Sequence, residues 1–100
     1  MSWPNDYETI ASIEWRYESW EYDRTEVYRR KDGALFRASD SGCSCPIPFE
    51  DTTEADLTPI RSLAEWNQFA RGSLGDSSSP DLTRRDIEEA TAIIRKHLAA

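Results

Sequence analysis

The chain has 100 residues, a formal net charge of −7 and 38% hydrophobic residues, four of them Trp. This length suits a single domain over residues 1–100 with one core, to which aromatic side chains contribute much of the apolar area. The excess of acids argues against nucleic-acid binding, because phosphate contacts need clustered Lys and Arg. No apolar run approaches the roughly 20 residues of a membrane span, and no signal peptide is recognisable at the start. We therefore expect a soluble cytoplasmic protein with no membrane partner.

The first part of the chain predicts a β-meander over residues 12–38, preceded by a polar N-terminal arm at residues 1–11. Alternation of apolar and charged residues from Ser12 onward indicates a half-buried strand, with one face formed by Ile13, Trp15 and Tyr17. A second strand is expected over Thr25–Lys31, which is rich in β-forming residues. Asp32-Gly33 then predicts a type I′ hairpin turn, so that Ala34–Ala38 runs back antiparallel to the second strand.

The last part of the chain, residues 57–100, predicts two helices. Leu57–Arg61 fits either a short edge strand or the first turn of a helix. Ser62 and Glu65 have the spacing of a capping box, which places the first helix from Leu63 to about Arg71. Its expected core side chains are Leu63, Trp66 and Ala70, flanked by Phe69. Gly72 is expected to end this helix in a left-handed conformation.

A second capping box is expected at Thr83–Asp86, with Leu82 and Ile87 placed as a hydrophobic staple. It predicts a helix over about Arg84–Leu98, whose apolar stripe consists of Ile87, Ala90, Ile94 and Leu98. This stripe should pack on the sheet. The predicted fold class is therefore α+β, a three-stranded antiparallel meander packed against two C-terminal helices.

Residues 39–56 join sheet and helices as a Cys/Pro loop followed by an acidic connector. We assign a structural role, that of a rigid corner, to Asp40, Gly42, Cys43, Cys45, Pro46, Pro48 and Phe49. Two thiolates can bind zinc, but a closed site needs four ligands, and only His97 and Asp40 are evident as further donors. We expect no metal or cofactor. A metal- or thiol-dependent activity centred on Cys43 and Cys45 is the alternative.

Acidic and aromatic residues are frequent in the segment 14–26. An aromatic patch with an acidic rim is typical of a protein-binding face. The predicted interaction surface consists of Glu14, Glu18, Trp20, Glu21, Tyr22 and Glu26. Two alternatives stay open: the N-terminal arm folds back over the aromatic residues, or the acids form a solvated surface that only keeps the protein in solution.

The loop string Asp-Ser-Gly-Cys-Ser-Cys-Pro-Ile-Pro-Phe-Glu, residues 40–50, follows the Asp32-Gly33 turn. In this string the chain resembles small uncharacterised proteins encoded by bacteriophages of actinobacteria, over roughly residues 22–66. The resemblance implies a phage-encoded accessory protein in the host cytoplasm. We therefore expect a non-enzymatic protein that binds and modulates a host protein, with defence proteins as one class of partner. A virion-associated structural component is a further alternative.

Overall fold

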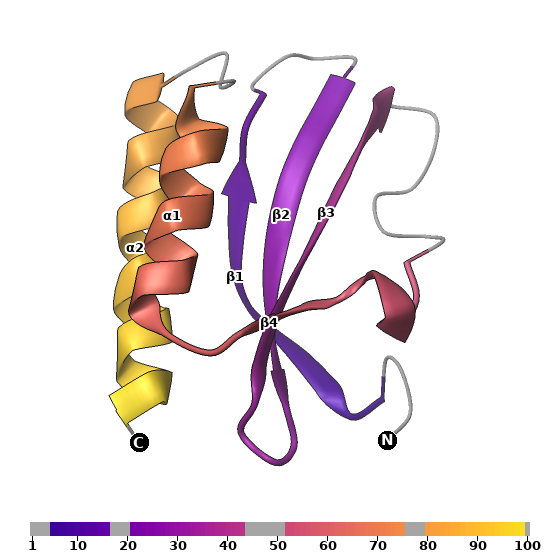
Figure 1. The fold of residues 1–100 in the computed structure, drawn as a ribbon. Helices are drawn as coiled ribbons and strands as arrows, with labels where there is room; N and C mark the ends of the chain where they lie inside the picture. Colours follow the sequence, from indigo (N-terminus) through magenta and orange to yellow (C-terminus); the bar gives the residue numbers. More distant parts are fainter. Residues whose placement is uncertain (1–4, 17–20, 44–51, 76–79, 100) are drawn as a thin grey trace.

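The computed structural model describes residues 5–16, 21–43, 52–75 and 80–99, without the side chains at 21, 22 and 43. The chain forms an α+β fold in which two neighbouring helices cover one face of an antiparallel sheet (Figure 1). The strands, in their order across the sheet, are β1 (Tyr7–Glu14), β2 (Glu21–Arg30), β3 (Leu35–Cys43) and β4 (Thr58–Ile60). A short 3₁₀ helix, η1 (Glu54–Asp56), precedes β4, and the helices are α1 (Leu63–Leu74) and α2 (Pro80–Ala99).

The α+β class is as predicted, but the described sheet has four strands where the sequence predicted three. The fourth strand settles the ambiguous segment 57–61, because β4 pairs with the first residues of β3. None of the helices in the described part of the chain is both long enough and apolar enough to cross a membrane.

β1 begins five residues earlier than predicted, so residues 7–11 belong to the sheet and not to an N-terminal arm. The register of β1 against β2 shifts between Thr9 and Ala11, which marks a β-bulge. The bulge interrupts the two-residue period, and this is why the alternation is visible only from Ser12 onward. Trp15 follows the strand, and its backbone N–H donates to the backbone carbonyl of Asp23 at 2.7 Å.

The hairpin between β2 and β3 lies where the sequence predicted it, but its turn type differs. The N–H of Gly33 donates to the carbonyl of Arg30 at 2.8 Å, and the N–H of Arg30 donates to the carbonyl of Ala34 at 2.8 Å. Gly33 has a φ of 96°. This three-residue connection is a type I turn with a glycine bulge, not a two-residue type I′ turn.

β2 and β3 are both longer than predicted, and residues 39–43 belong to β3 rather than to the Cys/Pro loop. Their register pairs Thr25 with Ser39 and Glu21 with Cys43. Ser, Gly and Asp have low β-propensity, so the extension of β3 depends on its pairing with β2 and not on its own sequence.

α1 begins as predicted, since the hydroxyl oxygen of Ser62 accepts a hydrogen bond of 3.2 Å from the N–H of Glu65. The helix continues through Gly72 to Leu74, so the prediction that Gly72 ends it was wrong. α2 begins at Pro80, a favoured residue for the first helical position, and Thr83 therefore lies inside the helix instead of capping it. The staple predicted for Leu82 is wrong for the same reason, and Leu82 is exposed.

The core lies between the helices and the sheet. Its buried members are Ile13, Trp15, Val27, Leu35, Ile60, Trp66, Ala70, Ala90 and Ile94. Of the predicted helix stripes, Trp66, Ala70, Ala90 and Ile94 are buried, and Leu63, Phe69 and Ile87 pack against them. Leu98 remains 37% exposed at the end of α2.

Candidate interaction surface

The sheet has one face against the helices and one face away from them (Figure 1). Ile13, Thr25 and Val27 are fully buried, and Ile13 and Val27 contact the helix core. Because side chains alternate along a strand, the residues between them lie on the opposite face, which we call the outer face. Its described members on β1, β2 and β3 are Tyr7, Thr9, Ser12, Glu14, Arg24, Glu26, Tyr28, Arg30, Phe36, Ala38 and Asp40, of which Tyr28 and Ala38 are buried.

One end of the outer face is acidic, but its charge is partly compensated. The Nε of Arg24 donates to Oε1 of Glu14 at 2.6 Å, and an Arg24 Nη lies 4.0 Å from Oε1 of Glu26. The hydroxyl of Thr9 donates to the other carboxylate oxygen of Glu26 at 3.4 Å. Two acids therefore share one guanidinium, and the group keeps a single net negative charge.

The structure brings together two of the six residues predicted as an interaction surface. Glu14 and Glu26 meet through Arg24 on the outer face. The backbones of Glu21 and Tyr22 lie in β2, opposite Cys43 and Gly42, and their side chains are outside the description. Glu18 and Trp20 lie outside the described residues altogether. The predicted aromatic patch thus stays a prediction.

Of the residues predicted as a rigid corner, some belong to β3 and the others lie outside the described residues. Asp40, Gly42 and Cys43 belong to β3, so they extend the sheet and do not form a loop. A carboxylate oxygen of Asp40 accepts the N–H of Ser41 at 3.0 Å. Cys45, Pro46, Pro48 and Phe49 lie outside the described residues. Within the described ranges, no three His, Cys, Asp or Glu side chains gather as metal ligands would.

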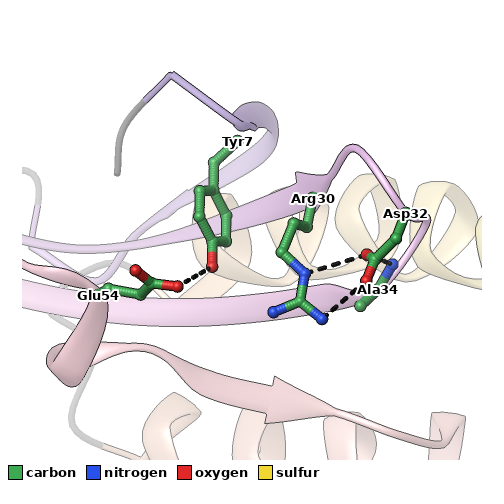
Figure 2. A network of polar contacts seen from close by, with 5 residues as sticks. All are labelled: Tyr7, Arg30, Asp32, Ala34 and Glu54. Atoms are coloured by element: carbon green, nitrogen blue, oxygen red, sulfur yellow. Dashed lines mark hydrogen bonds and ion pairs between the residues drawn. The ribbon is translucent and has the colours of Figure 1, made fainter. Parts of the chain in front are cut away.

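The other end of the outer face carries an aromatic and charged group that we call the Arg30 cluster: Tyr7, Arg30, Asp32, Phe36 and Glu54. The side chains of Tyr7 and Arg30 leave the sheet on the same side (Figure 2). The Tyr7 hydroxyl donates to Oε1 of Glu54 at 2.8 Å, which ties β1 to η1. The rings of Tyr7 and Phe36 meet edge to face, with their centroids 5.7 Å apart.

Arg30 is held in place from two directions. Its Cζ lies 4.9 Å from the centre of the Phe36 ring. Its Nε and one Nη donate to the two carboxylate oxygens of Asp32 at 3.0 and 2.8 Å (Figure 2). A bidentate guanidinium pair that also stacks on a ring has a well-defined orientation. The Arg30 side chain is nevertheless 27% exposed, so a partner can reach it.

Hydrogen bonds and burial fix the protonation of Arg30, Asp32 and Tyr7 at neutral pH, as the directions of their pKa shifts indicate. The hydrogen bonds from Arg30 and from the Ala34 N–H hold the pKa of Asp32 below its usual range. The hydrogen bond with Asp32 raises the pKa of Arg30. Partial burial, followed by the bond to Glu54, raises the pKa of the Tyr7 phenol. The cluster therefore presents an ionised pair beside a neutral phenol.

A family model for a domain of unknown function, DUF7574, matches residues 4–100. The chain belongs to the DUF7574 family. Comparison with curated proteins and with solved structures found no match. The DUF7574 match spans all four strands and both helices, and so extends well beyond the segment that carried the resemblance in the sequence.

In the DUF7574 domain the sequence did not indicate Tyr7, Phe36 or Glu54 as site residues. The Asp32-Gly33 turn does indicate that Arg30 and Phe36 come close, because they flank one hairpin. Tyr7 pairs with Arg30 only if β1 begins before its bulge, and Glu54 reaches Tyr7 across 47 residues. Tyr and Arg held in a rigid, partly exposed group can supply apolar area, stacking and directed hydrogen bonds to a protein partner.

Proposed function

We propose that this DUF7574 domain is a non-enzymatic protein-binding module that contacts its partner through the outer face of the sheet. The observation that carries the proposal is the Arg30 cluster, in which a partly exposed guanidinium lies over Phe36 beside the Tyr7 ring. Tyr and Arg are enriched among the residues that dominate binding free energies at protein interfaces. Because Asp32 and Phe36 already orient Arg30, little side-chain entropy is lost when a partner binds.

The proposal extends to a partner in a bacterial host. We propose a phage-encoded protein that acts in the host cytoplasm and modulates or inhibits a host protein, with defence proteins as one class. Support comes from the resemblance of the string at residues 40–50 to phage proteins. The net charge of −7 favours a partner with a basic surface, since opposite potentials accelerate association and exclude wrong partners.

A comparative capture experiment tests the proposal. Immobilised wild-type protein and its Arg30→Ala variant are exposed to an actinobacterial host lysate, and the retained proteins are identified by mass spectrometry. The matched control is Arg95→Ala, which removes an exposed arginine of α2, a helix on the other face of the sheet. We expect one protein to bind the wild type and the control but not Arg30→Ala.

The same pair of variants is then measured with the purified partner by calorimetry. Removal of a residue that dominates an interface weakens binding by roughly 30-fold or more, so Arg30→Ala should reach that loss while Arg95→Ala stays near the wild type. Circular dichroism confirms that both variants keep the fold. A partner that binds Arg30→Ala as tightly as the wild type would rule out the Arg30 cluster as its contact site.

A further inference from the structure

A recess of about 310 Å³ lies between the sheet and α1, on the helix side of β3. It is lined by Arg37, Glu65, Gln68 and Phe69. Arg37 pairs with Thr58 of β4. In the described sheet, this is where the pairing of β3 with β4 ends. The recess is therefore separate from the Arg30 cluster, which lies on the other face of the sheet.

Among the side chains that the structure describes, the guanidinium of Arg37 has an aromatic contact but no ion-pair partner. Its Cζ lies 3.8 Å from the centre of the Phe69 ring, a close stacking distance for a cation on an aromatic face. Among the described residues no carboxylate forms an ion pair with it. Partial burial lowers the pKa of Arg37, and the negative charge of Glu65 offsets this only in part. Within the part of the chain that the structure describes, Arg37 is thus a half-buried cation without an ion-pair partner.

We propose that this recess binds a small organic monocarboxylate, with its carboxylate on Arg37 and its apolar body along Phe69. A guanidinium that stacks through its face leaves its N–H edge available, and that edge matches a carboxylate bidentately. The exposed amide of Gln68 is a further donor on the rim. The volume is near the lower end of the roughly 300–1,000 Å³ typical of small-molecule sites.

Glu65 determines which anion suits the recess. Its carboxylate lines the same space and repels a second negative charge. A singly charged carboxylate with an apolar body is therefore favoured over phosphate, which carries more charge and gains nothing from Phe69. The proposal is independent of the protein-binding function, because it involves a different face and different residues.

Benzoate is the probe for the test, with benzamide as its neutral counterpart and inorganic phosphate as the competing anion. Binding is followed by NMR shifts of the Arg37 side-chain N–H and the Phe69 ring. A fragment of this size binds in the millimolar range. We expect benzoate to shift both groups, and benzamide and phosphate each to bind about tenfold more weakly or not at all. Equal binding of benzamide or of phosphate would overturn the assignment.

Two substitutions locate the site. Arg37→Gln should weaken benzoate binding about tenfold or more, because it removes a charge-assisted bond. Arg71→Gln, a change at an exposed arginine of α1 outside the recess lining, should leave benzoate binding unchanged. Unchanged binding in Arg37→Gln overturns the proposal.

A third substitution decides the matter if Arg37→Gln does not fold. Gln68 is exposed on α1, so Gln68→Leu keeps the core intact. Loss of its amide should weaken benzoate binding several-fold, by about the contribution of one hydrogen bond to a charged group. Full-strength benzoate binding in a folded Gln68→Leu variant contradicts the proposed arrangement.

Discussion

The buried hydroxyl of Thr83 donates a hydrogen bond of 3.1 Å to the backbone carbonyl of Glu14, and so joins α2 to the last residue of β1. One helical turn later, Asp86 accepts the N–H of the same Glu14 at 3.3 Å. β1 is an edge strand of the described sheet, and two side chains of α2 take the place of a neighbouring strand at its end. Covering an edge in this way protects it from pairing with another chain.

The first prediction concerns this contact. Thr83→Val keeps the volume of the side chain but leaves the Glu14 carbonyl without its partner on α2. We expect the free energy of unfolding to fall by about 1–2 kcal/mol, measured by urea denaturation. Leu82→Ala, a change at an exposed neighbour in α2, should alter it by less than about 0.5 kcal/mol. A Thr83→Val variant as stable as the wild type would show that the bond contributes nothing.

The second prediction contrasts two glycines that have equal space for a side chain. A Cβ at Gly33 or at Gly72 would meet no atom within 4 Å. Gly33 has a φ of 96°, so Gly33→Ala should lower the free energy of unfolding by about 1–2 kcal/mol. Gly72 lies inside α1, where Gly72→Ala should raise it by about 0.5–1 kcal/mol.

Urea denaturation of the two alanine variants side by side measures this contrast. The sign at Gly72 distinguishes the observed helix from the one that the sequence predicted. If Gly72 ended α1 in a left-handed conformation, alanine would be as unfavourable there as at Gly33. Destabilisation of similar size in both variants would therefore favour the shorter helix.

Much of the fold was predictable because its signals are local. The hairpin at Asp32-Gly33, the cap at Ser62 and the buried helix stripe through Trp66 and Ile94 all follow from short sequence patterns. The start of α2 was not predictable in this way. Thr83 and Asp86 have the three-residue spacing of a capping box, but in the structure both side chains bond to the backbone of Glu14 in β1. The sequence pattern is the same in both cases, and only the tertiary structure distinguishes them.

The site was less predictable than the fold, because its members come from different strands. The sequence indicated Glu14 and Glu26, but it could not show that Arg24 lies between them, since that depends on the register of β1 against β2. The Arg30 cluster needs the registers of three strands and the position of η1. The register of β1 against β2 shifts at a bulge near Ile10, so the alternation of apolar and polar residues does not predict it.

The third prediction concerns a partly buried chain of hydrogen bonds on the helix side of the sheet. The hydroxyl of Thr25 accepts the indole N–H of Trp15 at 2.8 Å and shares a bond of 2.7 Å with the hydroxyl of Ser39. Thr25→Val leaves the indole N–H of the buried Trp15 without that acceptor. We expect the free energy of unfolding to fall by about 1–3 kcal/mol.

Ser39→Ala is the matched control for this chain. Ser39 is exposed, so water can take its place, and the loss in the same urea measurement should stay below about 1 kcal/mol. A loss in Ser39→Ala as large as that in Thr25→Val would mean that the Trp15 bond is not the stabilising part of the chain.

The fourth prediction is a loss of stability at alkaline pH that depends on Tyr28. This side chain is only 4% exposed, and burial, followed by the negative charge and hydrogen bond of Glu26, raises the pKa of its phenol well above the ordinary value. The folded state therefore holds the proton more tightly than the unfolded state does. The resulting stabilisation is complete below the unfolded pKa of about 10 and is lost as the pH rises above it toward the folded pKa.

Urea denaturation at neutral pH and at a pH above 10 measures this dependence in the wild type, in Tyr28→Phe and in Tyr7→Phe. Phenylalanine at position 28 removes the titrating group, so the decline in the free energy of unfolding with pH should become shallower in Tyr28→Phe. Tyr7 is the control, because its phenol is bonded to Glu54 on an exposed part of the outer face and its pKa is raised less than that of Tyr28. Its variant should keep most of the wild-type decline. If Tyr28→Phe loses stability with pH as steeply as the wild type, the alkaline transition belongs to another group.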